Sequence, residues 1–207
     1  MRTATVDVYS YPELTEEAKD RAFNHWLETA DYPWQEEARQ TIAALGGVFG
    51  VVCYDWEYGV CRPYNFRLKF DNIDGDAMGL SGNRARSWLS NNIWDNTFAE
   101  KYAKKDRQGR TIWHTLGEVW DCCPLTGIWL DNEALRPLRD FVTGKGDYDT
   151  RRLYLHDRTT VEDVIRACFD ALFAELTRDC EYCSSREYFE EEANANDYEF
   201  TASGDRW

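Results

Sequence analysis

The chain has 207 residues, of which 43% are hydrophobic and 15% aromatic, and its formal net charge is −14. A chain of this length and composition can bury a sizeable core, which excludes intrinsic disorder as its general state. Its best apolar run, residues 48–54, is much shorter than the roughly 20 residues that a membrane-spanning helix needs, so we expect no membrane partner.

The first third of the chain alternates between predicted strands and helices. Thr15 is a typical N-cap for the first helix, and Gly46 with Gly47 predicts the end of the second. The later strands are rich in β-branched and aromatic residues. In chain order we expect a strand at 3–11, helices at 16–30 and 34–45, and strands at 48–59 and 64–72.

The remainder of the chain is predicted to be mainly helical. Asn91 and Asn92 mark a break in one helix. Thr160 is the expected N-cap of the helix that begins at 161, and Ser184 or Ser185 is the expected N-cap of the last helix. Residues 111–132 have no clear pattern. In chain order we expect a helix at 84–105, a turn at 106–110, a helix around Pro137, helices at 161–179 and 186–196, and a strand beginning at Tyr198.

The helix at 161–179 has the clearest apolar stripe in the sequence. Its members are Val161, Val164, Ile165, Cys168, Leu172 and Leu176. In the C-terminal strand, Tyr198 and Phe200 alternate with Glu199 and Thr201, so we expect the two aromatic residues to anchor the terminus. These patterns predict an α+β fold, in which helices pack on one face of a small antiparallel sheet that contains the N- and C-terminal strands. We expect a single acidic domain over 1–207, with 84–160 as a candidate insertion or subdomain.

The negative charge is concentrated at the two ends of the chain. Residues 1–57 carry a net charge of −7 and residues 161–207 carry −9, whereas residues 58–160 carry +2. Acidic surfaces repel nucleic acid and anionic membranes and attract basic partners. The basic segment 101–110 could contact phosphate, but a solvated helix end explains it as well. The sequence therefore disfavours direct binding of nucleic acid.

The cysteine content and the N-terminal sequence indicate the compartment. Seven cysteines are an odd number in a chain too long for a disulfide-stabilised miniprotein. The N-terminal segment has no apolar stretch followed by a small-residue cleavage site, which argues against secretion. We therefore expect reduced thiols and a cytoplasmic protein.

Two segments resemble a widespread set of acidic phage and prophage proteins. These are ELTEEAKDRAFNHW at 13–26 and ANDYEFTASGDRW at 195–207. Proteins of that set open with a Glu-Leu-Ser-Glu-Glu-Ala-like helix and close with Ala-Asn-x-Tyr-x-Phe-Thr before a turn. The resemblance covers roughly residues 12–60 and 179–207. It implies a mobile element that acts in a bacterial cytoplasm, and it supplies no catalytic motif.

Candidate metal sites are incomplete. Cys180 and Cys183 have the spacing of half a zinc site, and Cys122 with Cys123 could supply the other ligands, but adjacent cysteines rarely bind one ion together. The carboxylates at Asp71, Asp74 and Asp76 lack the spacing of a helix–loop–helix calcium site. We therefore expect no cofactor, with Cys180 and Cys183 as weak metal candidates.

No catalytic signature is present. The sequence contains no nucleophile elbow, phosphate-binding loop or HExxH motif, and His114 and His156 cannot be paired with a carboxylate from sequence alone. We therefore expect a protein that is not an enzyme.

Clusters of carboxylates on the predicted helices are the best candidate binding site. Side chains three or four residues apart on a helix lie about 5–6 Å from each other, close to the spacing of phosphates along a DNA strand. Lysine and arginine side chains that grip nucleic acid could bind such a row instead. The candidate residues are Glu16, Glu17, Asp20, Glu36, Glu37, Glu187, Glu190, Glu191 and Glu192.

The sequence leaves three functional hypotheses. The first is an anti-CRISPR-like inhibitor that binds a basic host protein or ribonucleoprotein complex, either a CRISPR effector or a restriction system, and competes with nucleic acid. The second is an accessory protein of the mobile element, which could act as a homodimer without mimicry. The third is a metalloprotein or enzyme of unknown reaction.

Overall fold

The computed structural model describes residues 6–73, 75–105, 107–118, 123–144 and 158–207. The chain divides into two compact units. Unit 1 comprises residues 1–35, 59–62 and 177–207, and unit 2 comprises residues 36–58 and 63–176. The sequence predicts one domain, whereas each unit has its own cluster of buried apolar side chains. The predicted insertion at 84–160 lies wholly inside unit 2.

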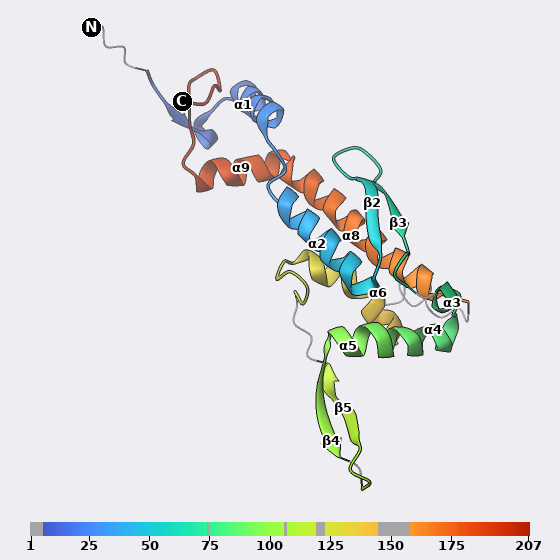
Figure 1. The fold of residues 1–207 in the computed structure, drawn as a ribbon. Helices are drawn as coiled ribbons and strands as arrows, with labels where there is room; N and C mark the ends of the chain where they lie inside the picture. Colours follow the sequence, from blue (N-terminus) through green and yellow to red (C-terminus); the bar gives the residue numbers. More distant parts are fainter. Residues whose placement is uncertain (1–5, 74, 106, 119–122, 145–157) are drawn as a thin grey trace. The chain divides into compact units, whose positions relative to one another are not determined.

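Unit 1 joins the two ends of the chain (Figure 1). Its elements are β1 (Tyr9–Ser10), η1 (Tyr11–Glu13), α1 (Glu16–Thr29), α9 (Arg186–Ala195) and β6 (Glu199–Phe200). Strand β1 pairs antiparallel with β6, with Tyr9 opposite Phe200. The N- and C-terminal strands thus lie in one antiparallel sheet, as expected.

Aromatic side chains form the core of unit 1. The Tyr11 ring lies 5.2 Å from Phe189 and 6.0 Å from Phe200, centroid to centroid. Ala18 and Ala22 complete the buried face of α1. The C-terminal segment is held by its backbone as well, because the Trp207 N–H donates to the Glu199 carbonyl at 2.8 Å. The aromatic tail therefore anchors the chain end, as the alternation of Tyr198 and Phe200 predicts.

Unit 2 contains most of the helices and two hairpins. Its helices are α2 (Gln35–Phe49), α3 (Gly75–Met78), α4 (Gly82–Leu89), the π-helical turn η2 (Ser90–Trp94), α5 (Asp95–Thr97), α6 (Leu130–Thr143) and α8 (Val161–Cys183). Its strands are β2 (Val52–Glu57), β3 (Asn65–Lys69), β4 (Ala99–Lys105) and β5 (Thr111–Glu118). Gln35 and the end of α8 from Thr177 onward belong to unit 1.

Helix α8 supplies the central part of the unit 2 core. The six residues of its predicted apolar stripe are all 0% exposed. The Thr160 hydroxyl accepts a hydrogen bond from the Asp163 N–H, and the Asp163 carboxylate accepts from both the N–H and the hydroxyl of Thr160. This reciprocal capping begins the helix where the sequence predicts it.

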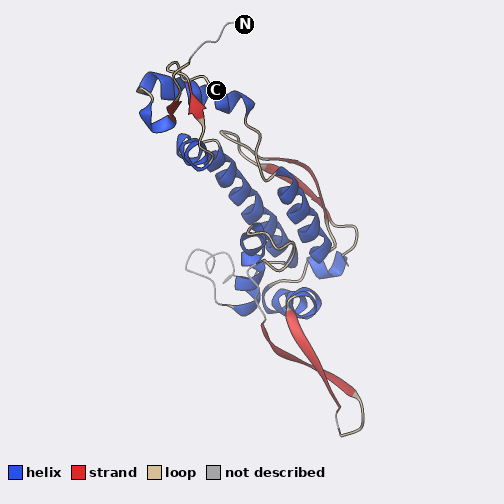
Figure 2. Cartoon of the chain, turned by 90° about the vertical axis from the view of Figure 1, so that its left-hand side faces the viewer, coloured by secondary structure: helices blue, strands red, loops and turns tan. Residues whose placement is uncertain are grey.

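The fold class is α+β, as expected. The strands of the described part of the chain form three two-stranded antiparallel sheets, β1–β6, β2–β3 and β4–β5, in place of one continuous sheet. The β2–β3 pairing is the one that residues 48–59 and 64–72 predict. Figure 2 shows β4 and β5 as a long hairpin.

Helix α2 continues past its predicted end. Gly46 and Gly47 lie inside the helix, which ends at Phe49 and is followed by Gly50 at a φ of +67°. Gly46 is a packing residue, because a Cβ atom there would lie 2.7 Å from the Val51 carbonyl oxygen. The left-handed C-terminal stop is therefore supplied by Gly50.

The predicted helix at 84–105 is wrong in its second half. The expected irregularity at Asn91 and Asn92 coincides with η2, but the helical segment ends at Thr97 and Ala99–Lys105 is strand β4. Residues Ala99–Lys105 pair with Thr111–Glu118, and this partner overrides the helical preference of alanine and lysine. Most of the basic segment 101–110 thus belongs to a hairpin.

Candidate partner-binding surface

The structure places seven of the nine predicted acidic residues in unit 1, and Glu36 and Glu37 in unit 2. Unit 1 contains 16 acidic and seven basic residues, a net charge of −9, while the longer unit 2 carries −5. Helices α1 and α9, which lie far apart in the sequence, pack together in this unit. The acidic ends of the chain therefore meet in one compact unit.

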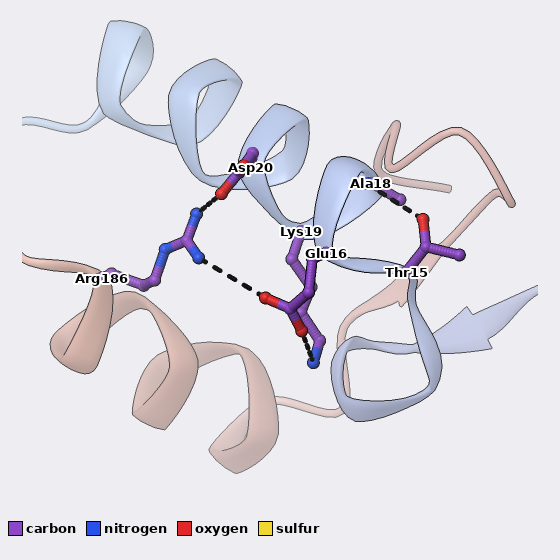
Figure 3. Close-up of polar contacts among 6 residues, drawn as sticks. All are labelled: Thr15, Glu16, Ala18, Lys19, Asp20 and Arg186. Atoms are coloured by element: carbon purple, nitrogen blue, oxygen red, sulfur yellow. Dashed lines mark hydrogen bonds and ion pairs between the residues drawn. The ribbon is translucent and has the colours of Figure 1, made fainter.

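Part of the α1 charge is already neutralised by Arg186 of α9. Figure 3 shows its guanidinium in contact with both Asp20 and Glu16. The distance from its Nη1 to the Glu16 carboxylate is 4.0 Å. Lys19 also pairs with Glu16 at 2.9 Å, and this hydrogen bond holds the pKa of Glu16 below its usual value. Glu16 and Asp20 thus already pair with basic side chains of unit 1, while both remain exposed.

The acidic residues of α9 divide into two groups. Glu191 accepts a hydrogen bond from the Tyr182 hydroxyl at 2.8 Å, and Glu192 accepts one from the Tyr198 hydroxyl at 2.7 Å. These bonds orient the carboxylates without cancelling their charge. The second group is Glu187 and Glu190, which are exposed and make no hydrogen bond or ion pair within the described residues. The same holds for Glu17 of α1.

A cavity of about 330 Å³ opens beside the paired terminal strands. Three carboxylates line it: Glu13, Asp197 and Glu199. Tyr9 and Tyr198 contribute aromatic walls, and none of the described lining residues is lysine, arginine or histidine. The cavity is thus a concave acidic surface suited to a cationic group.

The predicted binding set does not include the three carboxylates of this cavity. The sequence signal for them is the pair of strands expected at the two chain ends, because the pairing of β1 with β6 brings Ser10 opposite Glu199. The Glu13 carboxylate is oriented by the N–H and the hydroxyl of Ser10, both at 2.8 Å. These bonds lower the pKa of Glu13, so its side chain stays ionised at neutral pH.

The weak metal candidates Cys180 and Cys183 are buried thiols of α8. Burial raises the pKa of Cys180 to about 12 and that of Cys183 to about 11, with the Asp179 carboxylate adding to both shifts. Within the described ranges, no group of three His, Cys, Asp or Glu side chains is placed to hold a metal ion. Cys122, Asp74 and His156 lie outside the described residues.

No family model matches the chain, and no match was found among the curated proteins or the solved structures. In the part of the chain that the structure describes, no helix has both the length and the apolar character needed to cross a membrane.

Proposed function

We propose that the protein is a phage- or prophage-encoded inhibitor that binds a basic, nucleic-acid-binding defence complex of the host cell in the bacterial cytoplasm. The observation that supports this most is the acidic cavity of unit 1, with three carboxylates and no basic residue among its described lining. Its surroundings favour the same partner, because unit 1 carries a net charge of −9.

The proposed mechanism is competition for basic side chains. A lysine or arginine of the complex enters the cavity, where carboxylates form charge-assisted hydrogen bonds and the tyrosine rings face its cation. Glu17, Glu187 and Glu190, which are exposed on the same unit, contact further basic residues of the complex. Those side chains then cannot hold phosphates, so nucleic acid is excluded from the complex. No reaction and no cofactor take part in this mechanism.

Capture from a bacterial lysate tests the partner class. The tagged protein is immobilised, bound proteins are identified by mass spectrometry, and their nucleic-acid binding is measured with and without the inhibitor. We expect a basic complex that is retained at about 50 mM NaCl and released by about 500 mM, because salt screens exposed charges. Retention that does not change over this range contradicts electrostatic competition. An accessory protein without mimicry would leave nucleic-acid binding unaffected, and light scattering would then test whether it is a homodimer.

A pair of variants tests the site. D197N/E199Q removes two charges from the cavity, and asparagine tolerates the φ of +50° at position 197. We expect its affinity for the captured complex to fall about tenfold, since an exposed ion pair contributes roughly 0.5–1 kcal/mol. E36Q/E37Q removes the same charge from α2 in unit 2 and is expected to change the affinity by less than about twofold. Equal losses in both variants would show that net charge alone governs binding.

A further inference from the structure

A second cavity among the described residues lies in unit 2 and shares no lining residue with the acidic cavity. Its volume is about 640 Å³, within the range of roughly 300–1,000 Å³ that is usual for small-molecule pockets. Helices α6 and α8 form most of its wall, and Tyr64 and Thr159 line the rest. The apolar part of the wall consists of Pro137, Ala167, Ala171 and Ala174.

Two of the four charged residues in this wall are held by more than one polar contact. Asp163 caps α8 through its bonds with Thr160. Arg166 donates to Glu162 from both Nε and Nη2, at 2.8 and 2.7 Å, and lies over the Phe70 ring at 5.3 Å. These partners hold the two side chains in place and leave their charges in the cavity wall.

The other two charged residues retain binding capacity of opposite sign. Asp170 is exposed and has no hydrogen bond or ion pair among the described residues. Arg136 pairs with Glu133 through Nη1 at 3.1 Å, and its Nη2 has no hydrogen bond or ion pair among the described residues, whereas its Nε is buried without an acceptor. Its guanidinium is therefore incompletely satisfied. The cavity thus contains a carboxylate that can bind a cation, Asp170, and a guanidinium that can bind an anion, Arg136.

We propose that this cavity binds a small amphoteric molecule of the amino-acid or dipeptide class, with its carboxylate toward Arg136 and its ammonium group toward Asp170. The apolar side chain of the ligand lies on the alanine surface of α8 and beside Tyr64. A ligand with only negative charge meets Asp163 and Asp170, and a ligand with only positive charge meets Arg136 and Arg166. The mixed charge of the wall therefore selects a ligand that carries both signs.

Asp170 is also a suitable position for a test, because its replacement is expected not to weaken the fold. Although the Asp170 side chain reaches solvent, the protein atoms packed around its carboxyl partly desolvate it and raise its pKa, an effect that the nearby Arg166 opposes. The folded state thus binds a proton more tightly than the unfolded chain, so ionisation of Asp170 lowers stability as the pH rises through the folded pKa. We expect D170N to increase the free energy of unfolding at pH 7, and this gain to shrink toward pH 4 in urea titrations.

The binding test uses free dipeptides with one aromatic residue, such as Ala-Phe and Phe-Ala, together with their N-acetyl and C-amide derivatives. Saturation-transfer NMR and calorimetry on the full chain measure their affinities. We expect the free dipeptides to bind, and each blocked derivative to bind about tenfold more weakly because one charged contact is lost.

Three variants decide whether this cavity is the site. D170N should no longer distinguish a free dipeptide from its N-acetyl derivative, and R136Q should no longer distinguish the carboxylate from the amide. D55N, on strand β2 and outside the cavity lining, is the matched control and should bind as the unmodified protein does. The proposal is overturned if no dipeptide binds at about 10 mM, if blocked and free dipeptides bind equally, or if D170N and R136Q keep the original discrimination.

Discussion

Replacing Gly204 with alanine is expected to detach the C-terminal segment from α1 and to lower the free energy of unfolding of unit 1 by roughly 3 kcal/mol or more. A Cβ atom at this position would lie 2.2 Å from the Ala18 carbonyl oxygen, and the residue has a φ of +92°. The neighbouring atom belongs to the backbone of a helix, so it cannot rotate away as a flexible side chain would. Urea unfolding followed by tryptophan fluorescence measures the loss, and hydrogen exchange of residues 198–207 localises it.

G109A is the matched control for this substitution. Gly109 has a φ of +78°, but no described atom lies within 4 Å of the place that an added Cβ would occupy, so only the backbone strain of about 1 kcal/mol is expected. If G204A proves no less stable than G109A, the close contact between Gly204 and α1 does not anchor the chain end. Because β6 pairs with β1, loss of this anchor should also reduce binding at the acidic cavity.

Replacing Phe173 with alanine is expected to lower the free energy of unfolding of unit 2 by about 3–5 kcal/mol. The side chain is 0% exposed and stacks on Phe66 with a centroid distance of 5.0 Å. Trp56, Tyr58 and Tyr64 surround the same ring, with centroid distances of 6.2, 6.1 and 6.3 Å. The truncation removes buried apolar surface and leaves a cavity that these large rings cannot easily refill.

Two further variants calibrate the Phe173 result. F173L keeps most of the volume and is expected to cost less than about 1.5 kcal/mol. V52A removes an apolar group that is 51% exposed and should change stability by less than about 0.5 kcal/mol. Similar losses for F173A and V52A would contradict the central position of Phe173 in the core.

The acidic surface and the amphoteric cavity are formed by different residues of the chain. D197N/E199Q changes unit 1 only, and D170N with R136Q changes unit 2 only. Each set of variants thus serves as a control in the binding test of the other proposal. Capture of a basic complex by D170N at the original strength, together with loss of dipeptide discrimination, would show that the two proposals stand independently.

Features that depend on neighbouring residues were predictable from the sequence. Thr15 accepts the Ala18 N–H, Ser185 accepts the Tyr188 N–H, and Thr160 begins α8, as their positions before apolar helices indicate. The buried stripe of α8 follows from a spacing of three and four residues. These interactions form within one or two helical turns, so a short window of sequence contains all of their partners.

Features that depend on distant partners, or on a segment without a clear pattern, were not predictable. Asp131 is 0% exposed and accepts N–H bonds from Leu125, Thr126 and Gly127, in a segment to which the sequence assigns no structure. The Tyr32 hydroxyl donates to Asp179 across 147 positions. The sequence indicates no distant partner for the carboxylates of α1, yet Arg186 pairs with Asp20 across 166 positions.

The sequence by itself determined where most helices begin, which face of α8 is apolar, and that the two chain ends are acidic. Only the tertiary structure decided that α2 continues through Gly46, that Ala99–Lys105 is a strand, and which of the described carboxylates remain unpaired. The reason is physical: capping and periodicity act along a few residues of backbone, whereas burial and ion pairing depend on which distant segments share a surface. Composition therefore predicted an acidic protein, and packing alone produced its acidic cavity.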